Sequence, residues 1–200
     1  MIARFRICRR PGLVLLTVGL LHASGLAFAA PTNEFRLAMC PLVIPERGTV
    51  TGYLLQTSQG RFSFLPPLNW AVKEKAAAKE VVMMARNLIS SIRLRIVQDT
   101  PAANREAQLA RWREVVSENY SDGKVTAEFP CYTSKVTGVA FDLERVAANK
   151  AKIFTRLAFI PLSDGRVEFE LTTTFNETAD VRLAFGNLLT SFRIEAGTEK

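Results

Sequence analysis

Histidine is almost absent from this sequence of 200 residues, because His22 is the only one. Catalytic triads and dyads of the Ser-His or Cys-His type need an imidazole, and many zinc sites use one as a ligand. The sequence also lacks Gly-rich phosphate loops, Cys-x-x-Cys pairs and Asp-rich calcium loops. We therefore expect no cofactor, no metal site and no enzymatic activity.

The first 29 residues predict export. Four arginines within residues 1–10 precede an apolar run from Leu13 to Leu21, and Ala27-Phe28-Ala29 has the small-x-small form of a signal-peptidase site. The run is too short and too interrupted by glycine for a membrane span. We expect residues 1–29 to be a signal peptide that is cleaved after Ala29. Cleavage also removes His22. The mature protein is then expected in the periplasm or outside the cell, without a stable membrane span. The export route stays open, since Arg9-Arg10 also occurs in twin-arginine signals.

The net charge is small once this segment is removed. The segment holds four of the 26 basic residues and none of the 19 acidic ones, so the mature chain keeps 22 against 19 and a net charge of +3. Nucleic-acid binding needs a concentrated basic face, and the sequence shows no such cluster. We expect no nucleic-acid partner.

Cysteine is also rare, and Cys40 and Cys131 are the two that remain after cleavage. An even pair in an oxidising compartment predicts one disulfide between Cys40 and Cys131. The alternative is two buried thiols that act as small apolar side chains. A lipid-modified Cys40 is a further alternative, although the apolar run ends well before it.

The stretch from Ala151 to Arg193 predicts a hairpin followed by a helix, and we take it as the centre of the fold. Asp164-Gly165 lies between two strand-like runs and suits a two-residue type I′ turn, which pairs Leu162 with Val167 and Ile160 with Phe169. One face of the hairpin is then apolar across both strands. The other face carries Glu168 and Glu170 on the second strand but the apolar Ile153, Leu157 and Phe159 on the first. Because the first strand is apolar on both faces, it is predicted to be central in the sheet.

The rest of the chain predicts further strands and one more helix. A strand containing Phe62 and Phe64 ends at Pro66-Pro67, and a strand with alternating apolar residues covers residues 92–98. Asp99-Thr100-Pro101 predicts the start of a helix that ends near Tyr120. Residues 124–129 and 132–141 predict two strands that break at Pro130-Cys131, with a possible bulge at Gly138, and residues 142–150 predict a connection or one helical turn. A last helix is expected at 178–192.

The chain resembles the PsbP-like and DcrB-like superfamily in its Phe62-x-Phe64-x-Pro66-Pro67-x-x-Trp70 entry, followed by a sheet and a late helix that ends in Leu188-Leu189-Thr190-Ser191-Phe192-Arg193. The resemblance implies an exported α+β protein with an antiparallel sheet of about five to seven strands packed with helices, a PsbP-like sandwich. It implies no active site. The spacing of the apolar residues in 75–91 fits a helix, whereas the apolar run Val81–Met84 fits a strand. The resemblance favours the strand.

We therefore expect one PsbP-like domain at residues 49–194, preceded by an extended arm (30–48) and followed by a flexible tail (195–200). Arg86, Arg93 and Arg95 are candidate contacts for a partner, and the alternative is a solvated sheet face where arginines pair with Glu168 and Glu170. Three functions compete: a non-catalytic module that binds an envelope protein, which we favour; a small-ligand carrier; and a hydrolase that uses Glu168 and Glu170. The sequence leaves the oligomeric state open.

Overall fold

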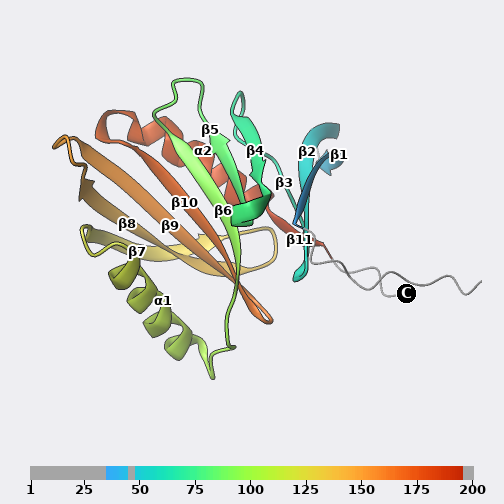
Figure 1. The fold of residues 1–200 in the computed structure, drawn as a ribbon. Coiled ribbons are helices and arrows are strands. Elements are labelled where there is room, and N and C mark those ends of the chain that lie inside the picture. The colour runs from blue at the N-terminus through green and yellow to red at the C-terminus, as the bar shows by residue number, and fades with distance from the viewer. Residues whose placement is uncertain (1–34, 45–47, 196–200) are drawn as a thin grey trace, which may run out of the picture. The chain divides into compact units, whose positions relative to one another are not determined.

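The computed structural model describes residues 35–44 and 48–195. Within these residues the chain forms two antiparallel sheets and two α-helices (Figure 1). The prediction of an α+β fold with an antiparallel sheet and packed helices is confirmed. The predicted signal peptide (1–29) and nearly all of the predicted tail lie outside the described residues.

The larger sheet has seven strands and contains the predicted hairpin. Its order across the sheet is β4-β5-β6-β10-β9-β8-β7, so β9 is an interior strand, as predicted. The predicted strand at Val81–Met84 is confirmed, because β5 covers it. The strands are β4 (Ala71–Lys75), β5 (Glu80–Met84), β6 (Ser91–Gln98), β7 (Lys124–Tyr132), β8 (Thr137–Val146), β9 (Lys152–Leu162) and β10 (Gly165–Thr174), with the short 3-10 helix η1 (Ala76–Ala78) between β4 and β5.

The smaller sheet was not predicted as a separate sheet. Its four strands are β1 (Arg36–Ile44), β2 (Gly48–Thr57), β3 (Gly60–Phe64) and β11 (Arg193–Glu195), in the order β1-β2-β3-β11. β1 pairs with β2 along all of its nine residues, from Arg36 opposite Gln56 to Ile44 opposite Gly48. The segment predicted as an arm is therefore extended, but its described part is a strand of this sheet.

The β9–β10 hairpin forms, with a turn one residue earlier than predicted. Leu162 pairs with Gly165, so the two turn residues are Ser163 and Asp164. Neither Asp164 nor Gly165 has the positive φ of a type I′ turn. Gly165 is needed for a different reason: a Cβ there would lie 2.2 Å from the carbonyl oxygen of Val97 on β6. The register differs from the prediction by two residues, which keeps every side chain on its predicted face.

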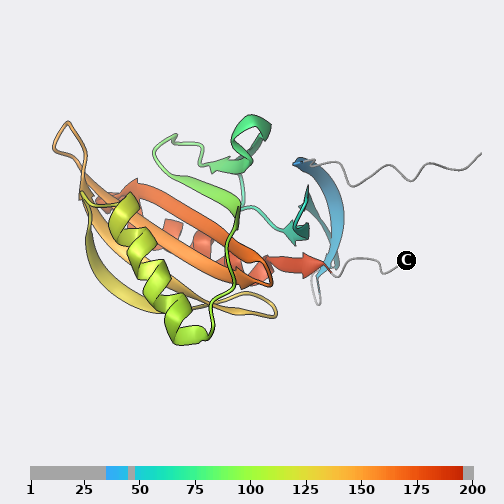
Figure 2. The same ribbon diagram turned by 60° about the horizontal axis from the view of Figure 1, so that its bottom comes forward.

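The two faces of the seven-stranded sheet have separate hydrophobic cores. α2 (Thr178–Ser191) follows the 3-10 helix η2 (Phe175–Glu177) and packs on one face together with the smaller sheet, where Phe169 contacts Phe185 and Phe192. α1 (Arg105–Asn119) packs on the other face, where Trp112 lies against Phe159 with their ring centroids 5.6 Å apart. Figure 2 shows α1 across the strands of this sheet.

The first helix begins later than predicted. Asn104 caps α1, and its side chain accepts a hydrogen bond from the backbone N–H of Ala107 at 2.9 Å. Asp99, in the predicted helix start, lies before the helix, and its carboxylate forms ion pairs with Arg111 and Arg166. A side chain held by two arginines is not available to cap a helix.

Three predictions around β7 and β8 are wrong. β7 continues through Pro130-Cys131, because it is an edge strand and a proline there costs no hydrogen bond within the sheet. The bulge lies in β7 between Val125 and Ala127, whereas Gly138 pairs regularly with Cys131. Residues 142–146 belong to β8 and are not a connection, since Asp142 pairs with Arg156 of β9 across the sheet.

Candidate functional site

The face of the seven-stranded sheet that carries α1 is divided into an apolar part and a charged part. α1 packs on residues of β8 and β9, which are Val139, Phe141, Leu143, Leu157 and Phe159. Beyond them, β10, β6, β5 and β4 continue the same face, and Figure 1 shows α1 away from these strands. The charged part therefore lies on strands that α1 leaves uncovered.

Two rows of directly opposed residues cross this face from β4 to β9. The first row is Lys75, Glu80, Arg95, Glu168 and Phe159, and the second is Lys73, Val82, Arg93, Glu170 and Leu157. Directly opposed side chains lie on the same face about 5 Å apart, close enough for opposite charges to pair. We call the two rows, up to Glu168 and Glu170 and with Arg166, the charged strip.

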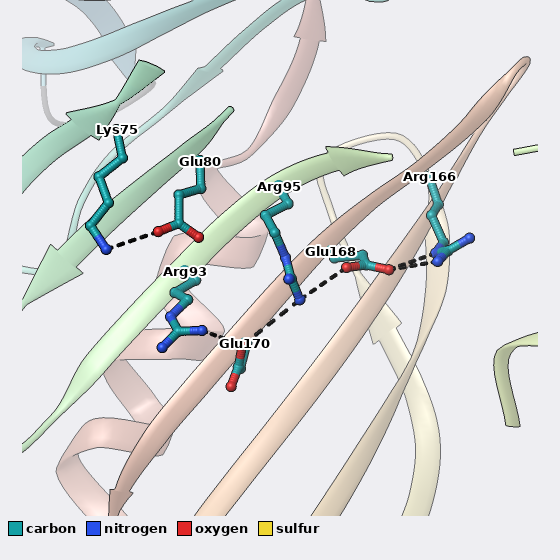
Figure 3. A network of polar contacts seen from close by, with 7 residues as sticks. All are labelled: Lys75, Glu80, Arg93, Arg95, Arg166, Glu168 and Glu170. Atoms are coloured by element: carbon teal, nitrogen blue, oxygen red, sulfur yellow. Dashed lines mark hydrogen bonds and ion pairs between the residues drawn. The ribbon is translucent and has the colours of Figure 1, made fainter. Parts of the chain in front are cut away.

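Charges alternate in sign along the first row, and its ion pairs fall into two sets, one between β4 and β5 and one between β6 and β10 (Figure 3). Lys75 Nζ lies 2.9 Å from a carboxylate oxygen of Glu80, and Arg95 Nη2 lies 3.2 Å from Glu168. Glu168 also accepts hydrogen bonds from Arg166, whose Nε lies 2.8 Å away. Side chains thus link β4 to β5 and β6 to β10, in addition to the backbone pairing.

The second row adds to the same network. Arg93 Nη1 lies 3.6 Å from Glu170, and Arg95 reaches Glu170 at 3.8 Å. Tyr120, which follows α1, borders the strip. Its burial, followed by the negative charge of Glu170, raises the pKa of the Tyr120 hydroxyl. The phenol therefore stays protonated at neutral pH.

Acidic and basic side chains of the strip differ in their exposure. The side chains of Glu80, Glu168 and Glu170 are only 8 to 11% exposed, whereas Lys75 and Arg93 are 49% exposed and Arg95 is 37% exposed. Lys73, in the second row, is exposed as well. Arg166 is only 9% exposed, so the carboxylates and Arg166 lie at the bottom of the strip and the other cationic groups lie on top of it. A molecule that approaches this face therefore meets positive charge first.

The structure brings together two of the three arginines predicted as partner contacts. Arg93 and Arg95 lie side by side in the charged strip, paired with Glu170 and Glu168 as the solvated-face alternative expected. Arg86 lies outside the strip, in the turn after β5, where its Nη2 donates a hydrogen bond to Asn69 Oδ1 at 3.4 Å. We had not predicted Lys75, Glu80 or Arg166 as site residues, because their place beside the arginines depends on the order of the strands in the sheet.

Glu168 and Glu170 are both held by arginines, and neither of them lines either of two clefts that the described residues form. One cleft, of about 300 Å³, lies between α1 and the ends of β8 and β9; it includes Asn104, Leu109, Trp112, Val139 and Pro161. The other, of about 410 Å³, lies beside the strip and includes Phe35, Gln59, Lys79, Arg95 and Gln98.

The predicted disulfide is not formed, and Cys40 and Cys131 are both free thiols. Cys40 lies in β1 of the smaller sheet, whereas Cys131 lies in β7, an edge strand of the larger sheet. Burial raises the pKa of the Cys131 thiol to about 12. Burial and, to a smaller extent, the charge of Glu195 raise the pKa of Cys40. Cys131 is therefore a small apolar core residue, as the alternative interpretation expected.

No three histidine, cysteine, aspartate or glutamate side chains within residues 35–44 and 48–195 are arranged so that they could hold a metal ion. No helix formed by these residues is both long enough and apolar enough to cross a membrane.

Comparisons with known proteins support the fold. No protein-family model and no curated protein matches the sequence. Among solved structures, cyanobacterial PsbP (CyanoP) from Synechocystis sp. PCC 6803 is similar with a TM-score of 0.54 and 12% identity, over 85% of this chain and 99% of that chain. LpqN from Mycobacterium tuberculosis, a protein involved in cell envelope biogenesis, is similar with a TM-score of 0.51 and 11% identity, over 80% and 92%.

A protein of known structure from Bacteroides thetaiotaomicron matches with a TM-score of 0.50 and 10% identity, over 70% of this chain. The match spans about half of that protein, 47% of its length. At such identities the likeness concerns the fold. The resemblance predicted from the Phe62 to Trp70 entry and the late helix is confirmed at this level: the chain has a fold similar to that of PsbP.

Proposed function

We propose that this protein is a non-catalytic accessory module of the cell envelope that binds an acidic protein through the charged strip. The observation that carries the proposal is the layered charge of the strip, in which Lys73, Lys75, Arg93 and Arg95 cover carboxylates that are nearly buried. A surface of this kind attracts carboxylates of a partner and repels basic proteins.

The ion pairs within the strip also favour binding. Arg93 and Arg95 are held in place by Glu168 and Glu170, so less side-chain entropy is lost when a partner binds than with unpaired arginines. Arginine can bind a carboxylate with two parallel hydrogen bonds. The exposed guanidinium groups keep this capacity for a partner.

A location in the envelope is part of the proposal. It rests on the signal-like segment at residues 1–29 and on the fold, which is shared with LpqN, itself described as involved in cell envelope biogenesis. The non-catalytic role is proposed because Glu168 and Glu170, which were the candidates for a catalytic pair of carboxylates, are each paired with arginine.

A small-ligand carrier is the second candidate, and one observation favours it. The cleft of about 300 Å³ between α1 and the sheet has a volume at the lower end of ligand pockets, and Leu109, Trp112, Val139 and Pro161 give it apolar walls. Polar side chains from the first turns of α1, Asn104, Arg105 and Gln108, line it as well.

Affinity capture from an envelope extract tests the proposal. The bait is the chain from Pro31 onward, compared with a variant that carries Lys73→Glu and Arg93→Gln. We expect a specifically retained acidic protein that is lost with the variant and released by moderate salt. The matched control carries Lys124→Glu and Arg113→Gln, which makes the same change in charge on the exposed surfaces of β7 and α1.

Equal retention by the variant and the wild type would show that the charged strip is not the contact. Native mass spectrometry of the same preparation tests the carrier. The carrier would be favoured over the binding module by two results together. A small molecule would have to co-purify with the wild type and be lost in Trp112→Ala, and no protein would be retained in the affinity capture.

A further inference from the structure

Two exposed turns lie at one end of β4, β5 and β6 (Figure 1). One turn joins β3 to β4 and carries Leu68 at its tip; the other joins β5 to β6 and carries Leu88 and Ile89. Leu68 is 88% exposed and Leu88 is 75% exposed, the two highest values among the large apolar side chains of the described chain. Leu68, Met84, Arg86, Leu88 and Ile89 together form what we call the turn patch.

The turn patch is held rigidly. The first turn is closed by a hydrogen bond from Trp70 N–H to the carbonyl of Pro67 at 3.1 Å, after two consecutive prolines. The second is closed by hydrogen bonds between Ala85 and Ser90 and from Leu88 N–H to the Ala85 carbonyl, each at 3.0 Å. The turns are also joined to each other, because Arg86 donates a hydrogen bond to Asn69 Oδ1.

Leu88 combines an exposed side chain with an unfavourable backbone conformation, and the two together point to a functional role. Leu88 has a φ of 59°, in the left-handed region where a large side chain is rare. A glycine or asparagine would suit this conformation better. A leucine in a strained conformation, with most of its side chain in water, gains nothing for the folded state from either property. Such strain is typical of residues kept for a function.

The composition of the turns indicates what they bind. Within residues 65–72 and 81–92, Arg86 is the one charged side chain, and the rest are apolar or neutral. Trp70, a residue type that prefers the boundary between water and lipid, follows Leu68 by two positions. An acidic protein surface would suit Arg86 and not the leucines, whereas a bilayer with anionic headgroups suits both.

The charges next to the turn patch lie at the depth where headgroups would be. Ala71, Met84 and Ser91 form the row of the sheet nearest to the turns, and the next row contains Lys73 and Arg93. Neighbouring rows on one face of a sheet are about 6.5–7 Å apart. Aliphatic tips inserted among the outer acyl carbons would thus leave Arg86, and then Lys73 and Arg93, among the phosphates.

We propose that the turn patch docks this protein onto the surface of an anionic lipid bilayer, with Leu68, Leu88 and Ile89 inserted and Arg86 bound to lipid phosphates. This role goes beyond the proposed binding of a protein and uses different residues for its apolar contact. The two can therefore fail separately.

Vesicle flotation tests the docking with the chain from Pro31 onward, since both hydrophobic cores are built from residues after Pro31. The vesicles contain equal parts of phosphatidylglycerol and phosphatidylcholine, or phosphatidylcholine alone. We expect binding to the anionic vesicles. Leu68→Ser with Leu88→Ser should lower the partition coefficient about tenfold or more, and Arg86→Ser about fivefold on the anionic vesicles.

A matched control changes Met39 and Val43 to Ser. These residues are also exposed, at 72% and 70%, but lie on β1 of the other sheet, so vesicle binding should stay as in the wild type. Lipids brominated in their acyl chains give a second measurement. Of the two tryptophans, Trp70 beside the patch should be quenched, and Trp112, buried between α1 and the sheet, should not.

The inference is overturned if the wild type does not float with the anionic vesicles, if the double leucine variant floats equally well, or if Trp70 is not quenched. Sedimentation without lipid tests whether a second copy of this chain, and not a bilayer, covers the turn patch. A concentration-dependent dimer that Leu68→Ser with Leu88→Ser abolishes would assign the turn patch to a second copy of this chain and would also overturn the lipid assignment.

Discussion

Glu168 of β10 lies directly opposite Phe159 of β9, so the charged row of the sheet meets the apolar core beneath α1 at this pair. Phe159 packs against Trp112, and Glu168 is held by Arg95 and Arg166. A buried carboxylate beside an aromatic cluster is stable only when it is fully paired. Arg95 and Arg166 are therefore required by the fold, and Arg95 still exposes 37% of its side chain to solvent.

Glu168→Gln tests this requirement. The substitution keeps the shape of the side chain but removes the charge that pairs with Arg95 and with the nearly buried Arg166. We expect the free energy of unfolding to fall by about 1–3 kcal/mol, measured by urea denaturation. Glu128→Gln is the control, because its partner Arg113 is more than half exposed, and the loss should be much smaller. Equal losses in the two variants would contradict the structural role of Glu168.

Gly165→Ala tests the close approach of β10 to β6. The added Cβ would lie 2.2 Å from the carbonyl oxygen of Val97, a backbone atom that cannot move without disturbing β6. We expect a loss of about 1–3 kcal/mol in the free energy of unfolding. Gly186→Ala in α2 is the matched control: nothing lies within 4 Å of the added methyl group, and alanine favours a helix. This variant should be as stable as the wild type or more stable.

The hairpin shows what the sequence can predict and where such prediction ends. Alternation of apolar and polar residues assigned Val167 and Phe169 to one face and Glu168 and Glu170 to the other, and this assignment holds for any register that is shifted by two. The turn itself was misplaced because glycine suits both a positive φ and a close backbone contact. Only the neighbouring strand, β6, decides between the two uses at Gly165.

The charged strip could be predicted only in part for a similar reason. The alternation of Arg93 and Arg95 with apolar residues placed both on one polar face, and β10 supplied Glu168 and Glu170. Lys75 and Glu80 lie in β4 and β5, and Glu80 lies directly opposite Arg95 because β5 pairs with β6 in one particular register. Long-range pairing of this kind leaves no periodic signal in the sequence. The helix start at Asn104 was missed likewise, since Asp99 is occupied by arginines from α1 and β10.

The ion pair between Glu128 and Arg113 predicts a dependence of stability on pH. Hydrogen bonding to Arg113 lowers the pKa of Glu128, so the folded state binds a proton at this carboxylate more weakly than the unfolded state does. The pair therefore contributes to stability above the unfolded pKa, about 4.3, and the contribution is lost as the pH falls through the lower folded value. In Glu128→Gln, the free energy of unfolding should change less between pH 6 and pH 3 than in the wild type. An unchanged difference would contradict the pairing.

Thiol labelling tests the state of the two cysteines. Denatured, unreduced protein should show two reactive thiols in the chain from Pro31 onward, because Cys40 and Cys131 are free. In the folded protein at pH 8, Cys40, which is half-buried, should react first. Cys131 should react only as the protein unfolds, since it is buried and its pKa of about 12 leaves almost no thiolate. Cys40→Ser isolates the slow reaction and Cys131→Ser the fast one.

Rapid labelling of Cys131 in folded Cys40→Ser protein would mean that β7 opens at the edge of the sheet. The absence of reactive thiols in the denatured protein would show that Cys40 and Cys131 form the disulfide after all.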